Sequence, residues 1–174
     1  MRLFIAIPLP PDGMRAVASA RVALESCGAK GRLVPRENYH ITLHFLGETD
    51  RLAEAADAIR EAVRDIPPFV LRLKDYGSSK SEGTHTGFLS VACDSDELDR
   101  LYESLESALW ERGFTKNRGK LTPHVTLGRK IEGDEDFALP PQKAAFTANM
   151  VVLYESSSVR GQMQYNVLHR EMLV

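Results

Sequence analysis

One short motif occurs twice in this 174-residue sequence, and its residue types suit proton transfer around a bound anion. The first copy, HITL, contains His40 and Thr42, and the second copy, HVTL, contains His124 and Thr126. Because imidazole has an unperturbed pKa of about 6.5, one histidine can accept a proton while the other donates one. The threonine hydroxyls could hold the non-bridging oxygens of a phosphodiester while the histidines act on its attacking and leaving oxygens. These four residues form the candidate site.

Each copy of the motif is expected to lie on a β-strand, because isoleucine, valine and threonine favour strands. Successive side chains of a strand point to opposite faces, so residues two apart share one face. This alternation places His40 beside Thr42, and His124 beside Thr126. A single His-x-Thr is best explained as an ordinary amphipathic strand, but the doubled motif in two similar halves favours a function. The near-symmetry leaves open which histidine is the acid and which is the base.

A metal site is the main alternative explanation for the two histidines. Zinc usually takes three or four His, Cys or carboxylate ligands, whereas the motifs offer two histidines and two threonines. Cys27 and Cys93 are the two cysteines of the chain, and neither has the spacing of a metal ligand. A Ser-His-Asp nucleophile is also disfavoured, because the sequence contains no G-x-S-x-G. We therefore expect neither a metal nor a cofactor.

The composition is that of an ordinary globular protein, with 43% apolar and 26% charged residues. The length fits one domain, residues 1–174, which we expect to be a monomer. A net charge of −2 gives no case for extended nucleic-acid binding, so any RNA would be held locally, at an end or a single phosphate. The two cysteines indicate the reducing cytoplasm, and no apolar run is long enough to cross a membrane.

The elements that must position the motifs follow from apolar spacing. Strands are predicted at residues 2–7, 32–35, 39–46, 69–76, 86–93, 145–154 and 164–172, and after Pro123. Helices are predicted at residues 14–25, from a cap at Thr49 or Asp50 through about residue 65, and from residues 94–95 to Gly113. The polar segment 77–83 and the acidic segment 131–141 are expected to be loops. The order indicates an α+β fold of two pseudo-symmetric lobes, with antiparallel sheets facing a central cleft and helices on the outside.

The two motif blocks, PRENYHITLHFLGE and GKLTPHVTLGRK, resemble the signature motifs of the 2H phosphoesterase superfamily. The fit is closest to its bacterial and archaeal 2′-5′ RNA ligase-like branch, the RNA 2′,3′-cyclic phosphodiesterases. The opening segment RLFIAIPLP and the closing segment LYESSSVRGQMQYNVL resemble the same branch, so the likeness covers nearly the whole chain.

The resemblance implies metal-independent hydrolysis of a 2′,3′-cyclic phosphate to a 2′-phosphomonoester, with RNA ends or nucleotides as substrates. It also leaves room for the reverse 2′-5′ ligation. His124 would be the base that activates water, and His40 the acid that protonates the departing 3′ oxygen. Thr42 and Thr126 would hold the phosphate. This assignment of acid and base comes from the resemblance alone.

Two further residues beside the motifs are candidates for substrate binding. His44 stands where this branch commonly has arginine, and by alternation it shares the face of His40, so we expect it to line the cleft. The alternative is a partly exposed strand position. Arg129 has the opposite parity to His124, so it either supports the cleft from behind or reaches the substrate once the strand bends.

Aromatic residues and loop cations complete the candidates. Phe88 and Tyr165 could stack on a base, although most aromatic residues in such strands are core. The cations of residues 115–120 could guide an RNA end, although a solvated loop explains them as well: Lys116, Arg118 and Lys120. The leading hypothesis is an RNA-end cyclic phosphodiesterase. The alternatives are a phosphodiesterase for a small cyclic nucleotide and a non-catalytic nucleotide-binding module.

Overall fold

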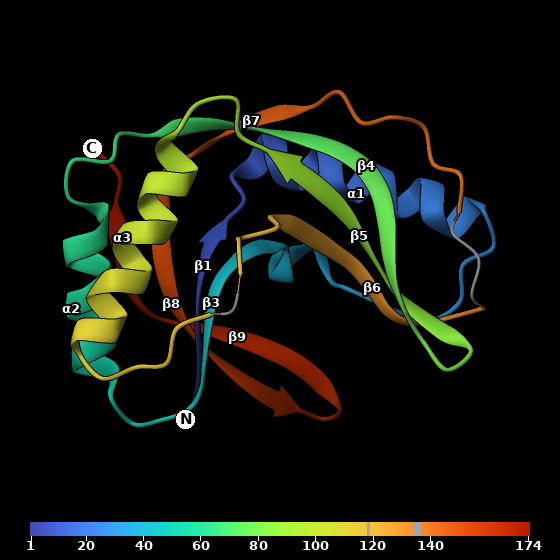
Figure 1. Ribbon diagram of the computed structural model, residues 1–174. Helices are drawn as coiled ribbons and strands as arrows, with labels where there is room; N and C mark the ends of the chain where they lie inside the picture. Colours follow the sequence, from blue (N-terminus) through green and yellow to red (C-terminus); the bar gives the residue numbers. More distant parts are fainter. Residues whose placement is uncertain (118, 134–136) are drawn as a thin grey trace.

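The computed structural model describes residues 1–117, 119–133 and 137–174. Within these residues it contains three α-helices, a short 3₁₀ turn at Arg36–Asn38 and strands that form two antiparallel sheets (Figure 1). The candidate loop cation Arg118 and residues 134–136 of the expected acidic loop lie outside the described residues. No helix of the described residues is long and apolar enough to span a bilayer.

The first sheet carries the first motif, in the strand order β3-β1-β8-β9. Its strands are β1 (Arg2–Pro8), β3 (His40–Glu48), β8 (Met150–Val159) and β9 (Gln162–Met172). The central strand, β1, reads RLFIAIP and is buried at five consecutive positions, because both of its faces are covered. Late in the chain, β8 pairs with β1 and β9 pairs with β8, so the lobes are not simply the two halves of the sequence.

The second sheet carries the second motif, in the strand order β2-β6-β5-β4-β7. Its strands are β2 (Arg32–Leu33), β4 (Phe69–Ser81), β5 (Thr84–Ala92), β6 (His124–Glu132) and β7 (Ala145–Ala148). The prediction of a loop at 77–83 is wrong, because most of this segment extends β4 as one arm of a long hairpin with β5. Its polar side chains are half-buried or exposed, so they lack the apolar alternation that reveals a strand.

The helices cover the outer faces of the sheets (Figure 1). They are α1 (Pro11–Ser26), α2 (Leu52–Val63) and α3 (Glu97–Glu111). α2 packs on β8 and β9 and lies beside α3, whereas α1 packs on β6 and β7. Thus α1 follows β1 of the first sheet but packs on the second sheet, which the next strand, β2, joins, so this segment ties the two lobes together.

Both motif strands contain a β-bulge at the leucine of the motif. In the first sheet, Ala6 pairs with Thr42 but Ile5 pairs with His44, so Leu43 is the extra residue. In the second sheet, Leu127 is skipped between the partners of Phe88 and Gly87 in the same way. A bulge reverses the alternation of side chains beyond it. The first six positions of β3 and β6 consequently share one pattern of buried and partly exposed residues.

Candidate active site

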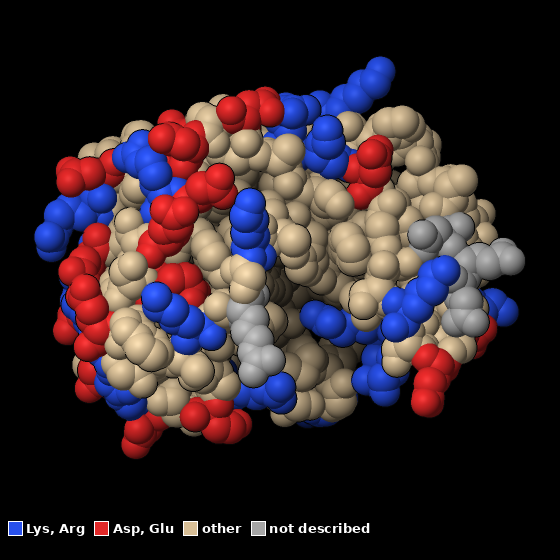
Figure 2. Space-filling model, in the orientation of Figure 1, with Lys and Arg blue, Asp and Glu red and all other residues tan. Residues whose placement is uncertain are grey.

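The two motifs meet in a cleft of about 620 Å³ between the sheets. β3 and β6 lie next to each other at this junction, so His40 and Thr42 line the cleft from the first sheet. His124 and Thr126 line it from the second sheet, together with Arg129. Figure 2 shows the surface hollowed near its centre in the same orientation. The structure therefore brings together five of the six side chains selected from the sequence.

Each motif histidine is held by the carbonyl oxygen two residues before it. Nδ1 of His40 lies 2.7 Å from the oxygen of Asn38, and Nδ1 of His124 lies 2.8 Å from the oxygen of Thr122. Because a carbonyl oxygen only accepts hydrogen bonds, Nδ1 of each ring is the protonated donor. Nε2 is thus the atom left for acid–base chemistry on both rings.

The surroundings of the two rings differ. Nε2 of His40 lies 3.0 Å from Oγ1 of Thr42, and in the neutral ring it accepts the threonine proton. The ring of His40 packs against Phe4, with centroids 5.0 Å apart, and against the edge of Tyr165, at 5.2 Å. Burial lowers the pKa of His40, and the hydrogen bond to Asn38 opposes this change.

Charge across the cleft acts on His40 in the same direction as its burial. The positive charges of Arg129 and His124 also lower the pKa of His40. A phosphate between these groups would favour the protonated ring, because an opposite charge nearby stabilises the charged form. Burial and the two positive charges therefore favour neutral His40, and an anionic ligand acts against that preference.

The prediction that His44 lines the cleft is wrong. The bulge at Leu43 turns His44 to the opposite face, where its side chain is only 3% exposed. Its Nδ1 lies 2.5 Å from Oε1 of Glu106 on α3. Oε2 of the same carboxylate accepts a hydrogen bond from the backbone of Asn117, whose side chain donates to the carbonyl of Leu43. His44 is therefore part of a buried network that holds the bulge.

The same bulges bring Phe45 and Arg129 into the cleft. Phe45 lines the cleft with 66% of its surface exposed, and sequence reasoning missed it. It stands at the position of β3 that corresponds to Arg129 on β6, five residues after the motif histidine. The sequence left two positions open for Arg129, one behind the cleft and one in the cleft after a bend in the strand. The structure shows the second. The repeated motif alone does not predict that Phe45 faces the cleft. That prediction requires the bulge at Leu43 to be known.

Some of the remaining candidates lie in or near the cleft, and others lie away from it. Phe88 lines the cleft, and its ring centroid lies 5.1 Å from that of His124. Tyr165 contacts the edge of His40, as described above. Lys116 lies over the ring of Trp110, at 5.5 Å, away from the residues that line the cleft. Aromatic side chains thus flank both histidines.

The cleft is suited to an anion. None of the described side chains that line it is acidic, and Arg129 is a fixed positive charge. In Figure 2 the carboxylates gather mainly over the α2–α3 side of the molecule, whereas Lys and Arg side chains lie around the central hollow. In the three ranges that the structure covers, no group of three His, Cys, Asp or Glu side chains could hold a metal ion.

The relatives found by comparison with known proteins agree on one family. The model of the 2′-5′ RNA ligase superfamily matches residues 9–156. An RNA 2′,3′-cyclic phosphodiesterase of Thermotoga maritima is 32% identical over 178 residues, covering 97% of this chain and 94% of that protein. An RNA 2′,3′-cyclic phosphodiesterase of Escherichia coli is 30% identical over 171 residues, which cover 97% of this chain and 94% of that protein.

Solved structures share the whole fold. TT0787 of Thermus thermophilus superimposes with a TM-score of 0.84 at 26% identity, covering 99% of this chain and 98% of that one. E. coli LigT complexed with 3′-AMP gives a TM-score of 0.78 at 27% identity, covering 99% and 97%.

The paired His-x-Thr strands face each other across a cleft between two antiparallel sheets, with no acidic side chain among its described lining residues, and define a two-histidine phosphoesterase. The chain belongs to the 2′-5′ RNA ligase superfamily. The resemblance to the 2H phosphoesterases and the α+β fold predicted from the sequence are both confirmed.

Proposed function

We propose that this protein is an RNA 2′,3′-cyclic phosphodiesterase that works without a metal ion. The observation that carries the proposal is the pair of histidines, His40 and His124, with Nδ1 of each fixed by a carbonyl. Both rings line one cleft, and none of the lining residues that the structure describes is a carboxylate. Two such rings can serve as acid and base on opposite sides of a phosphorus atom. The names of the relatives support the same reaction.

In the proposed mechanism, the cyclic phosphate lies between the motif threonines, and Arg129 neutralises part of its charge. Nε2 of His124 takes a proton from water, and the water oxygen attacks phosphorus. The bond from phosphorus to the 3′ oxygen breaks, and protonated His40 gives its Nε2 proton to that oxygen. The product is a 2′-phosphomonoester with a free 3′ hydroxyl. The roles of His40 and His124 follow the family resemblance.

The size of the cleft and a solved relative support a nucleotide ligand. A volume of about 620 Å³ lies within the usual range for small-molecule sites, roughly 300–1,000 Å³. The E. coli relative was solved in complex with 3′-AMP. We propose that the substrates here are RNA ends or nucleotides that carry a 2′,3′-cyclic phosphate.

The test is turnover of 2′,3′-cyclic mononucleotides and of an oligonucleotide ending in the cyclic phosphate, with EDTA present throughout. We expect hydrolysis of both, with the 2′-phosphate as the product. Activity that disappears in EDTA and returns with one divalent ion would contradict metal independence. Turnover of a small cyclic nucleotide alone would favour the narrower phosphodiesterase, and binding without turnover would favour a nucleotide-binding module.

A further inference from the structure

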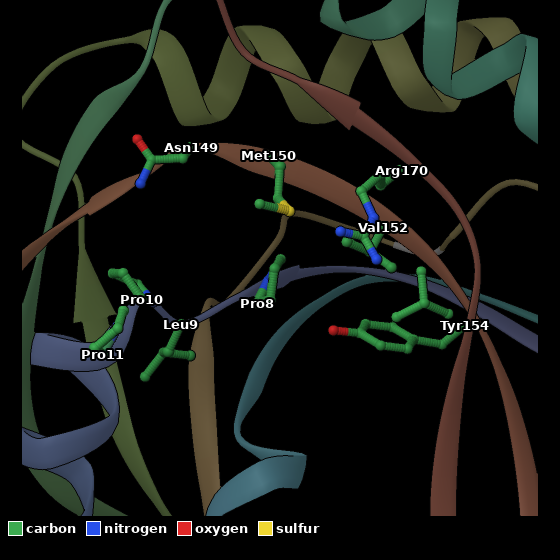
Figure 3. A pocket seen from close by; sticks show the side chains of 10 residues that line it. Pro8, Leu9, Pro10, Pro11, Asn149, Met150, Val152, Tyr154 and Arg170 are labelled. Atoms are coloured by element: carbon green, nitrogen blue, oxygen red, sulfur yellow. The ribbon is translucent and has the colours of Figure 1, made fainter.

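A second cavity, of about 380 Å³, lies on the first sheet (Figure 3). Directly opposed residues of antiparallel strands point to the same face. Pro8, which lines the second cavity, is paired with His40, which lines the catalytic cleft. Val152 is paired with Ala6, itself the partner of Thr42. The cavity therefore opens on the same face of the sheet as the first motif.

Tyr154 joins the two spaces. Its side chain lines the second cavity, and its ring centroid lies 6.3 Å from that of His40. Tyr154 also stacks on Phe4, with centroids 5.1 Å apart, and Phe4 in turn packs on His40. A ligand that extends from the catalytic cleft along this face of the sheet would meet Tyr154 and then the second cavity.

The second cavity combines apolar walls with a single cation. Pro8 and Val167 contribute apolar surface, and Val167 is 46% exposed, whereas Val152 is buried at the floor of the cavity. The guanidinium of Arg170 lies over Val152 at the cavity (Figure 3). Within the described ranges, Arg170 has no carboxylate partner. A flat apolar surface beside an unpaired guanidinium suits a nucleobase and the phosphate attached to its sugar.

We propose that this cavity binds the nucleotide that precedes the cyclic phosphate in the RNA chain. Its base packs on Pro8, Val167 and Tyr154, and the phosphate between the two nucleotides pairs with Arg170. The terminal nucleotide has aromatic neighbours of its own in the catalytic cleft, Phe88 among them. A net charge of −2 gives no case for extended RNA binding, so a local subsite is what would distinguish RNA from a mononucleotide.

This proposal rests on the proposed function and adds a preference for chain length. The substrates for the test are a 2′,3′-cyclic mononucleotide and a dinucleotide that ends in the same cyclic nucleotide. We expect the wild-type protein to have a kcat/KM about tenfold higher for the dinucleotide, the range of one hydrogen bond to a charged group.

Arg170→Gln should remove most of this preference while leaving turnover of the mononucleotide unchanged. Val167→Trp, which fills the cavity without removing a charge, should have the same selective effect. Arg64→Gln is the matched control, because Arg64 is an exposed arginine at the end of α2, and it should change neither substrate.

The outcomes separate this proposal from the function itself. Equal kcat/KM of the wild-type protein for the two substrates would overturn the subsite and leave the phosphodiesterase intact. Equal losses on both substrates in Arg170→Gln would also overturn it, because the arginine would then act on the terminal nucleotide. Turnover of neither substrate by the wild-type protein would overturn both proposals together.

Discussion

β3 and β6 present the same backbone with different surroundings. In both strands the motif histidine bonds the carbonyl two residues earlier, and the motif leucine forms a bulge. After the bulge, however, β3 places Phe45 in the cleft, whereas β6 places Arg129 there. The duplicated backbone sets where the two imidazoles stand, and the neighbouring side chains make the two rings unequal.

The buried sides of the two bulges differ as much as the cleft sides. On β3, His44 is fixed by Glu106, and Asn117 satisfies the carbonyl of the bulged leucine. On β6 the corresponding residue is Gly128, where an added Cβ would lie 2.9 Å from Cδ2 of Leu33. One bulge is therefore held by polar bonds, and the other by close packing against a glycine.

Removal of either histidine should produce the largest effect and tests whether the two strands act as one unit. We expect His40→Ala and His124→Ala each to reduce kcat by about 10²–10⁴-fold, because each removes a proton-transfer group. The double variant should lose much less than the product of the two single losses. Turnover numbers for folded proteins, checked by circular dichroism, decide this. A near-fully active single variant would rule out the two-histidine mechanism.

The threonines test whether the phosphate is held symmetrically. Hydrogen bonds to charged groups contribute about 1.5–3 kcal/mol, so Thr→Val at position 42 or 126 should lower kcat/KM by about 10–150-fold. Thr→Ser keeps the hydroxyl and should recover most of this loss. The Thr42 variant should lose more than the Thr126 variant, since Thr42 also bonds Nε2 of His40. A fully active valine variant would mean that the hydroxyl serves only strand packing.

The two bulges should be stabilised by different interactions on their buried sides, polar bonds on β3 and close packing on β6. Glu106→Ala leaves the buried His44 and the backbone of Asn117 without an acceptor, so we expect a loss of about 1–3 kcal/mol in the free energy of unfolding. Gly128→Ala should cost less, because the atom that the added Cβ meets at 2.9 Å is the end of the Leu33 side chain, which can shift. Urea titration measures both, with Glu103→Ala on the exposed side of α3 as the control. Glu106→Ala as stable as wild type would show that this network does not support the bulge.

The smallest expected effect is a shift in pH dependence, and it assigns the acid. The pKa of His40 is lowered from its ordinary value of 6.5, and kcat/KM reports ionisations of the free enzyme. If His40 is the acid, kcat/KM falls as pH rises through this lowered pKa, because the proton to be donated is lost. Arg129→Gln removes a charge that lowers the pKa, so this alkaline limb should move to higher pH. Movement of the acidic limb instead would make His40 the base.

The sequence predicted the motif faces correctly up to the bulge and failed beyond it. His40 and Thr42 precede the bulged Leu43, so simple alternation holds for them. His44 follows it, and its parity is reversed. A bulge is set by pairing with the neighbouring strand and by contacts such as the one from Asn117, which come from distant parts of the chain. No local pattern in HITLHFLG records these contacts.

The order of the elements was predictable, but their pairing was not. Apolar spacing located the three helices and most strands, with α1 beginning a few residues earlier than expected, at Pro11. The extension of β4 through 77–83 depends on cross-strand pairing with β5, which a polar run does not reveal. Likewise, no local pattern shows that β8 and β9 join the first sheet and not the second.

Because β8 and β9 belong to the first sheet, the surroundings of the first motif are completed late in synthesis. β1 and the first motif leave the ribosome early, yet the aromatic surroundings of His40 include Tyr154 and Tyr165, which are translated near the end. The second motif, by contrast, pairs with β5, a strand already made when β6 emerges. During synthesis, the first of the two motifs to appear is therefore the last to receive its complete surroundings.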